Sequence, residues 1–364
     1  MKTNKIIAIM AVVIILATGI VGIYVLNKGN DSDANTITDM RGREVALPET
    51  IDSIICFSSC SLELVSYFDA VGKVSFIDTN EYRMTPTDRT YYYTMKEKFQ
   101  GLERIDPSNS EAVYSTGADL IIASTIEVQT LNDRQNEYGI PIFAINADLE
   151  FGPEFDRQLR LLGKLFGEEE RAEEIVSGIA KFIGDITNNV PESYDIRGYA
   201  CGMNYQNATV NAFLRASGDY LPFDYSMITN IFESNSSGSP PKQPMPVGVE
   251  EVLDRSPDYI FIDGVNLNAS KEYLKDHFTL FKEKTDAVPN NVYKVMIYKS
   301  WGTNWENQLI NAYFVADIIH GDVFDWNFEE KADEILQLFY RDAAVSYSDL
   351  ASAQTGEGCG KVSF

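Results

Sequence analysis

One stretch of the sequence is unusually rich in tyrosine and arginine. Between Tyr82 and Tyr93 it contains four tyrosines and two arginines, among them Arg83 and Tyr92. Aromatic rings offer flat faces for stacking, and guanidinium groups form paired hydrogen bonds with anionic groups. The stretch follows an apolar run at 74–77 and is predicted to be a connecting loop. Its composition suits recognition of a ligand, and a tyrosine cluster that packs on itself is the alternative.

A second group of candidates stands at the start of a predicted helix. The apolar run 51–57 is followed by Ser58-Ser59-Cys60-Ser61 and then by apolar residues at helical spacing. Backbone N–H groups at such a helix start are free, so Ser59 and Cys60 are predicted to receive an anionic group. A serine that merely caps the helix is the alternative. A helix N-terminus would lower the pKa of the Cys60 thiol and allow it to ligate a metal, although a small buried cysteine is the commoner explanation.

Further candidates follow apolar runs in the second half of the chain. Tyr205 and Arg215 come after the run 195–201, and Trp301 comes after the run 292–298, beside a glycine. A tryptophan beside a glycine in a loop can offer its large aromatic face to a ligand. Trp301 is therefore the main aromatic contact that we predict, with simple packing as the alternative.

Signatures of catalysis and of bare-metal binding are missing from the sequence. There is no G-x-S-x-G, P-loop, H-E-x-x-H or C-x-x-C motif. Zinc and manganese sites usually contain several histidine ligands. This chain has two histidines, His277 and His320, and both fall in predicted helices. We predict no catalytic residue, no metal ligand and no cofactor. An enzyme remains the competing hypothesis, because an acid–base pair could hide among 54 Asp and Glu residues.

The elements that must position these residues alternate between helix and apolar strand. Residues 101–125 are predicted to form a helix and then a buried strand, 127–138 a helix, and 140–145 another strand. This alternation is typical of a parallel, layered α/β lobe. Apolar residues at helical spacing from Phe155 to Ile186 then predict about 30 residues of nearly continuous helix.

A short internal similarity indicates a second lobe beyond this helix. Ser110–Ser124 and Val249–Asp263 align without a gap, which places Asp119 opposite Asp258. The predicted fold is therefore α/β, with two similar three-layer lobes joined by one long rigid helix and a ligand cleft between them. The predicted boundaries are a membrane segment at 1–30, a first lobe at 31–152, the helix at 153–188, a second lobe at 189–345 and a tail at 346–364.

The beginning of the chain determines the predicted compartment. Lys2 and Lys5 precede Ile6–Leu26, which carries no charge and is long enough to span a bilayer. The basic end should stay inside, so the rest is predicted to be extracytoplasmic and anchored to the outer face of the cytoplasmic membrane. A cleaved signal sequence is the alternative. The net charge of −24 argues against a nucleic-acid partner, and the spacing of the four cysteines identifies no disulfide pairing.

Several segments, taken in order, resemble one known family. They are Asp39–Pro48, Ile54–Val74, Gly101–Ser124, Ile140–Ile145, Leu159–Val176, Val249–Asp263 and Phe324–Tyr340. The set resembles the helical-backbone periplasmic-binding proteins that serve iron-siderophore, haem and cobalamin importers. No single motif is diagnostic, but the resemblance covers nearly the whole chain after residue 35.

The resemblance implies a function, partners and docking residues. It implies that the chain captures a metal chelate (ferric siderophore, haem or corrinoid) and delivers it to the permease and ATPase of an ABC importer. It also implies one acidic docking residue per lobe, and the matching positions are Glu63 and Glu250. A glutamate near a helix start is favoured by the helix dipole alone, which is the plainer explanation. An oxyanion receptor, a receptor that signals without import and an enzyme on the same frame remain open.

Overall fold

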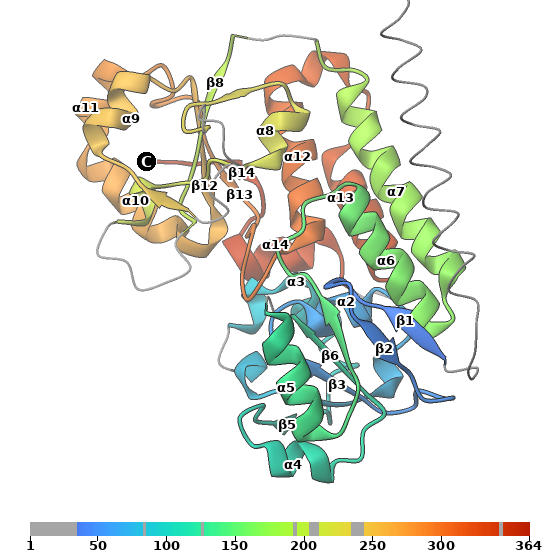
Figure 1. Ribbon diagram of the computed structural model, residues 1–364. Coiled ribbons are helices and arrows are strands. Elements are labelled where there is room, and N and C mark those ends of the chain that lie inside the picture. Colours follow the sequence, from blue (N-terminus) through green and yellow to red (C-terminus); the bar gives the residue numbers. More distant parts are fainter. Residues whose placement is uncertain are drawn as a thin grey trace, which may run out of the picture. The chain divides into compact units, whose positions relative to one another are not determined.

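The first lobe is built on a five-stranded parallel sheet with strand order β5-β4-β3-β6-β7 (Figure 1). The strands are β3 (Ile54–Phe57), β4 (Val74–Asp78), β5 (Glu103–Ile105), β6 (Leu120–Ser124) and β7 (Ile142–Ile145). Strands β3, β6 and β7 are apolar and largely buried, as expected for a parallel sheet covered on both faces. The predicted alternation of helix and strand in this lobe is confirmed.

The computed structural model describes residues 35–82, 85–124, 127–191, 195–203, 211–233, 244–341 and 345–364. The predicted membrane segment, Ile6–Leu26, lies outside these ranges. Within them, no helix combines the length and apolar character needed to cross a membrane.

The helices of the first lobe are short. They are α2 (Ser61–Ser66), α3 (Thr90–Thr94), α4 (Ser110–Ser115) and α5 (Val128–Tyr138), with 3-10 turns η1 (Val71–Lys73), η2 (Thr79–Tyr82) and η3 (Pro86–Asp88). The tyrosine- and arginine-rich stretch is therefore not a simple loop. Its described part forms η2, η3 and α3, which hold several of its side chains in fixed positions.

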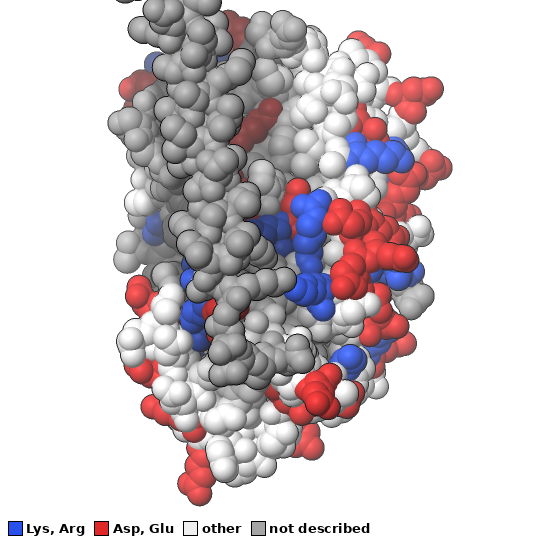
Figure 2. Space-filling view, turned by 45° about the vertical axis from the view of Figure 1, so that its right-hand side comes forward, with Lys and Arg blue, Asp and Glu red and all other residues white. Residues whose placement is uncertain are grey.

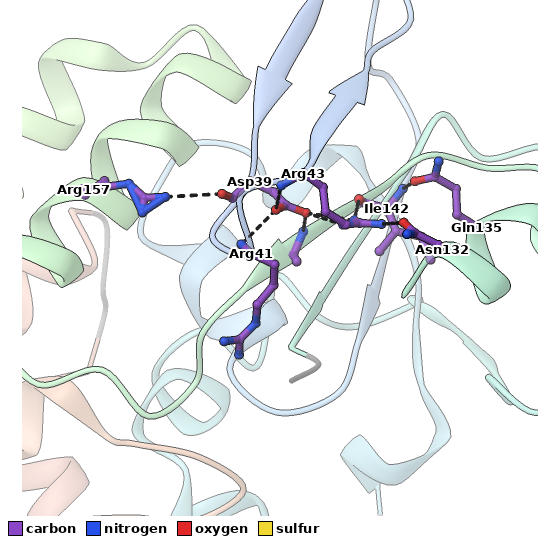
Figure 3. Close-up of polar contacts among 8 residues, drawn as sticks. Asp39, Arg41, Arg43, Asn132, Gln135, Ile142 and Arg157 are labelled. Carbon is purple, nitrogen blue, oxygen red and sulfur yellow. Dashed lines mark hydrogen bonds and ion pairs between the residues drawn. The ribbon is translucent and has the colours of Figure 1, made fainter. Parts of the chain in front are cut away.

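A small hairpin is attached to the edge of this sheet (Figure 3). It consists of β1 (Thr36–Thr38) and β2 (Glu44–Ala46). The buried Asp39 carboxylate accepts hydrogen bonds from the backbone N–H groups of Arg41 and Arg43, at 2.8 and 3.0 Å, and pairs with the Arg43 guanidinium. Arg43 in turn donates to the Ile142 carbonyl of β7. The turn is thus pinned to the lobe by one buried carboxylate.

Two helices, not one, follow the first lobe. α6 (Pro153–Phe166) ends at Gly167, which has a left-handed φ of 72°, and α7 (Glu169–Thr187) begins just after it. A Cβ added at Gly163 of α6 would lie 2.7 Å from the Cβ of Ala172, so the two helices pack closely side by side (Figure 1). The prediction of one continuous helix is wrong, because glycine at this position ends the helix although the apolar spacing continues.

The second lobe contains a mixed sheet with strand order β11-β9-β8-β12-β13-β14, and β10 pairs with β8. The strands are β8 (Arg197–Cys201), β9 (Arg215–Ala216), β10 (Thr229–Asn230), β11 (Met245–Pro246), β12 (Tyr259–Asp263), β13 (Val292–Val295) and β14 (Gly360–Lys361). The central strands β8, β12 and β13 are parallel, whereas β14 runs antiparallel to β13. Residues predicted to be a tail therefore supply an edge strand of this sheet.

The helices of the second lobe include a long buried one. They are α8 (Leu221–Tyr225), α9 (Val249–Arg255), α10 (Leu267–Asp276), α11 (Phe278–Lys284), α12 (Trp305–His320), α13 (Phe328–Phe339) and α14 (Tyr347–Thr355), with η4 (Ala212–Leu214), η5 (Gly264–Asn266) and η6 (Gly321–Val323). Every residue of α12 from Trp305 to Ala316 is buried. The largest core cluster joins residues of α12, α13 and α14 to residues of the first lobe, α6 and α7. The lobes therefore share a core in addition to being connected by α6 and α7.

The internal similarity has a structural counterpart at two aspartates. Asp119 opens β6, and its carboxylate accepts the N–H groups of Asp52 and Ser53 at 2.8 and 2.9 Å. Asp258 opens β12, and its carboxylate accepts the N–H of Arg197 at 2.8 Å. The backbone N–H of each aspartate also donates across to the neighbouring strand, at 2.9 Å in both cases. In both lobes, the aspartate at the start of the aligned strand thus binds the backbone of the neighbouring segment, as the alignment predicts.

The charged surface is mixed in sign. Figure 2 shows groups of acidic side chains with lysines and arginines beside them on one face of the molecule. Ion pairs of this kind link Arg160 to Glu173 and Arg341 to Glu174. Exposed pairs contribute little to stability, so they explain solubility better than they explain the fold.

Candidate functional site

Two loops from different lobes meet at the carboxyl ends of their sheets. One is Ser58–Cys60, which follows β3, and the other is Lys299–Thr303, which follows β13. We call them the junction loops. A Cβ added at Gly302 would lie 2.1 Å from Cys60 Sγ and 3.4 Å from Ser59 Cβ. Only a residue without a side chain allows so close an approach.

The backbone of both junction loops is in an uncommon conformation. Ser58, Cys60 and Trp301 have φ values of 66°, 61° and 54°, and Gly302 has a φ of 117°. Left-handed conformations of non-glycine residues cost free energy, and they concentrate at functional sites. The Asp78 carboxylate accepts the Ser58 N–H at 3.0 Å and helps to hold its loop. The concentration of strain at one junction marks it as the candidate site.

The lobes are tied together around these loops by hydrogen bonds. Thr303 Oγ1 donates to the Ala147 carbonyl at 3.2 Å, and Trp305 Nε1 donates to the Leu149 carbonyl at 2.9 Å. The Thr90 N–H donates to Asn304 Oδ1 at 3.3 Å. Residues that follow β13 are thus joined to residues that follow β7 and to α3, so the lobes are in direct contact at the junction.

Ser59 and Cys60 occupy the junction but differ in what they can do. The half-buried Ser59 hydroxyl lies 3.3 Å from that of Ser124, so hydroxyls at the ends of β3 and β6 stand together. Cys60 is fully buried, and its Sγ lies 3.8 Å from the Ala147 carbonyl oxygen. Burial, and next the Glu63 carboxylate, raise the pKa of the Cys60 thiol. The predicted lowering is wrong, and a protonated, enclosed thiol does not suit metal ligation.

Trp301 faces a buried charged cluster of the first lobe. Glu81 pairs with Arg89 and accepts a hydrogen bond from Tyr91 at 2.8 Å. Burial raises the pKa of Glu81, while Arg89 and, to a smaller extent, Trp301 lower it. The half-buried Trp301 carries an indole N–H that is enclosed and makes no hydrogen bond of ordinary geometry. Because this N–H acts on the buried Glu81 carboxylate, the part of Trp301 that is predicted to contact a ligand is its aromatic face.

The remaining residues of the tyrosine-rich stretch pack within the lobe. The Arg89 guanidinium lies over the Tyr92 ring, 4.2 Å from its centre, and Tyr92 also packs on Phe99 at 5.4 Å. Tyr92 is therefore engaged in the packing that was the alternative prediction. Arg83 and Tyr205 lie outside the described residues. Arg215 begins β9, half-buried, and its Nε atom is enclosed without a hydrogen-bond partner.

The two predicted docking glutamates have opposite environments. Glu63 is only 1% exposed, and its carboxylate accepts a hydrogen bond from Tyr67 at 2.9 Å. A buried carboxylate cannot pair with an arginine of another protein, so the structure contradicts the docking role predicted for Glu63. Glu250 is exposed in the first turn of α9 and remains a prediction.

Sequence reasoning missed two carboxyl groups of the second lobe whose pKa values are raised by burial. Asp224 in α8 has its pKa raised to about 6 by burial and then by Glu233 and Glu150, and Glu150 belongs to the segment that follows β7. Asp263, at the end of β12, accepts the N–H groups of Val265 and Tyr298 at 2.8 and 2.9 Å. Burial raises its pKa to about 7. The spacing of single aspartates and glutamates carries no signal that would have distinguished these from the many others.

Histidines and cysteines are engaged in ordinary structural contacts. His277 Nδ1 lies 2.8 Å from the Tyr273 carbonyl oxygen, and His320 Nε2 lies 2.9 Å from that of Ser226. All four cysteines are free thiols. No group of three or more potential metal ligands occurs within the ranges that the structure describes.

A family model named periplasmic binding protein matches residues 81–294, which is more than half of the chain. The chain belongs to this family. Proteins of the family bind solutes outside the cytoplasm, so this periplasmic binding protein is a substrate-binding protein of an ABC transporter and not an enzyme. Its location is extracytoplasmic.

Solved structures with the same fold are distant in sequence. The ABC transporter solute binding protein from Sulfurospirillum deleyianum is 16% identical, with a TM-score of 0.66 over 87% of this chain and 98% of that one. The molybdate periplasmic binding protein MolA from Haemophilus influenzae is 17% identical, with a TM-score of 0.65 over 86% and 99%. The TroA-like periplasmic binding protein FepB from Veillonella parvula is 18% identical, with a TM-score of 0.62 over 90% and 99%. No curated protein sequence matches the chain.

Proposed function

We propose that this periplasmic binding protein captures a metal chelate at the junction loops and delivers it to its ABC permease. The observation that carries the proposal is the meeting of Ser59, Trp301 and Gly302 at the carboxyl ends of strands from both sheets. Ligands of open α/β sheets bind at the carboxyl ends of the strands. An aromatic face beside two serine hydroxyls suits a bulky and polarised ligand.

The membrane anchor belongs to the same proposal. An uncharged segment at Ile6–Leu26 would tether the protein to the outer face of the cytoplasmic membrane, next to the permease. Glu250, exposed on α9, is the residue of the second lobe that we propose for docking on a permease arginine.

An oxyanion receptor is the second candidate. The Haemophilus influenzae relative was solved with molybdate, and the paired hydroxyls of Ser59 and Ser124 could donate to such an anion. The two candidates differ in what they require of Trp301. A bulky chelate needs its ring, whereas a small oxyanion needs only donors.

The test is a thermal-shift panel on the full-length chain with ferric siderophores, haem, cobalamin and molybdate. A ligand that binds only the folded protein raises the melting temperature by mass action. We expect a rise with one class of metal chelate and no rise with its metal-free form. A rise with molybdate alone would favour the oxyanion receptor.

Two substitutions then locate the site. We expect Trp301→Ala and Arg215→Ala each to weaken binding of the active ligand by tenfold or more with the fold intact, while Trp301→Phe keeps part of the affinity. Ser110→Ala, on the outer helix α4, is the control. Unchanged affinity in both alanine variants would remove the two residues from the site.

A further inference from the structure

A buried cluster of two glutamates and two tyrosines joins the lobes behind the junction loops. Tyr67 OH lies 2.9 Å from Glu63 Oε1 and 2.9 Å from Glu306 Oε2. Tyr340 OH donates to the other oxygen of Glu306. Glu63 belongs to α2 and Tyr67 follows it, whereas Glu306 belongs to α12 and Tyr340 follows α13. Each of the four side chains is no more than 1% exposed.

Counting hydrogens shows that this cluster must hold an extra proton. A tyrosine hydroxyl carries one hydrogen, so Tyr67 can donate to Glu63 or to Glu306 but not to both. The hydroxyl hydrogen of Tyr340 is donated to Glu306 Oε1, the carboxylate oxygen that does not contact Tyr67. If both glutamates were ionised, one carboxylate oxygen would face the Tyr67 oxygen at 2.9 Å with no hydrogen between them. A proton on one of the two carboxyls removes this repulsion, because that carboxyl then donates to Tyr67.

The groups around the cluster favour the extra proton. Burial and then Glu306 raise the pKa of Glu63, with a smaller contribution from Glu81 of η2. Burial raises the pKa of Glu306, whereas hydrogen bonds from Tyr340 and Tyr67 lower it by less. Cys60 lies within hydrogen-bonding reach of Glu63, and Tyr91 of α3 is close enough to interact with it.

Two guanidinium groups of the same region are engaged elsewhere. Arg89 pairs with Glu81. Arg171 of α7 donates to the carbonyls of Tyr67, Leu338 and Phe339 and pairs with Glu174. Neither arginine appears among the groups that lower the pKa of Glu63 or Glu306.

A small cavity lies next to the two tyrosines of the cluster. It has a volume of about 140 Å³ and is lined by Tyr67, Tyr340 and Arg171, together with the exposed side chains of Lys98 and Arg341. This is room for several water molecules.

We propose that Glu63 and Glu306 share a proton across the two lobes, and that this proton holds the lobes together at the junction. Loss of the proton places two negative charges on either side of one hydroxyl and loosens the contact between α2 and α12. The lobes therefore open more readily as the pH rises. Because Cys60 leads into α2 and touches the Gly302 loop, the same proton is linked to the candidate ligand site.

Amide hydrogen exchange of the full-length chain tests this linkage. The Thr90 N–H donates to Asn304 across the lobes, so its exchange reports opening, whereas the Ile121 N–H lies inside the first sheet and reports unfolding of that lobe. After correction for the intrinsic rate, we expect opening at Thr90 to increase up to tenfold per pH unit above 4.5, the ordinary glutamate value, until the raised pKa is reached. Exchange at Ile121 should lack this dependence.

The matched variant is Glu63→Gln, whose amide can donate permanently to Tyr67. We expect it to fold, to keep Thr90 protected and to lose the extra pH dependence, while Glu330→Gln, an exposed control on α13, behaves like the unsubstituted protein. An unchanged pH slope in Glu63→Gln would overturn the proposal.

Infrared difference spectra give a second measurement that does not depend on opening. At pH 6 we expect the unsubstituted chain to show a protonated-carboxyl band that Glu63→Gln or Glu306→Gln removes. Identical carboxyl spectra in the unsubstituted chain and both variants would show that no proton is held there, which refutes the proposal whatever ligand the protein binds.

Discussion

Gly302→Ala is the most informative single substitution at the junction. Its Cβ would lie 2.1 Å from Cys60 Sγ, far inside van der Waals contact, and the residue has a φ of 117°. A side chain in this backbone region costs about 1–3 kcal/mol. Overpacking against the buried thiol adds about 1–3 kcal/mol. We therefore expect the free energy of unfolding to fall by about 2–6 kcal/mol, unless the lobes separate to relieve the overlap.

A double substitution separates the two costs. Cys60→Ala removes the sulfur, so Gly302→Ala should cost less in that background by about 1–3 kcal/mol, which is the overpacking part alone. Urea denaturation of the four proteins, with m-values compared, measures the coupling. Lobe separation would appear instead as a changed fluorescence of Trp305, whose indole donates to Leu149 across the junction. Strictly additive costs with unchanged fluorescence would refute the close contact between the junction loops.

Three further predictions concern stability. Burial raises the carboxyl pKa of Glu306 to about 7. The stability that protonated Glu306 contributes to the folded state is therefore fully present below pH 4.5 and is lost as the pH rises through 7. Between pH 4.5 and 7, the free energy of unfolding of the unsubstituted chain should fall by about 1.4 kcal/mol per pH unit more than that of Glu306→Gln. Urea denaturation at several pH values measures this difference. Asp119→Ala and Asp258→Ala should each cost about 1–3 kcal/mol in urea denaturation, because each leaves strand N–H groups without an acceptor; a loss in only one would argue against equivalent lobes. Arg171→Met should cost about 3–5 kcal/mol and Arg171→Lys less, since the guanidinium donates to carbonyls of both lobes; equal melting temperatures would contradict this.

The alternation of buried strands and helices was predictable because it depends on local apolar runs. Strands such as β6 and β12 are continuous apolar segments that follow an aspartate, and this pattern repeats in the sequence. The extent of α12 was not predicted, although His320 at its end was expected to be helical, because the helix is buried all round and lacks a polar face with helical spacing. β14 was missed because a two-residue edge strand carries too little pattern to recognise.

The candidate site was only partly predictable for a different reason. Ser59, Cys60 and Trp301 were singled out because serine, cysteine and tryptophan at strand ends are unusual; the structure brings them to one junction, and their binding role stays a prediction. The approach of Gly302 to Cys60 depends on how two distant loops meet, which local sequence does not encode. Glu63 was misassigned because its position in a helix start is that of an exposed residue, while a helix from the other lobe covers it.

The position of β14 has a consequence for how the protein is made. β13 acquires its antiparallel neighbour only when residues 360–361 arrive, and α14 just before them supplies Gln354, which bonds to Thr90 of the first lobe. A chain that crosses the cytoplasmic membrane as an extended thread, amino end first, can complete its first sheet early in translocation. Its second sheet and the seam between the lobes must wait for the last stretch to emerge. Export therefore imposes an order of assembly in which the first sheet can form before the second is complete.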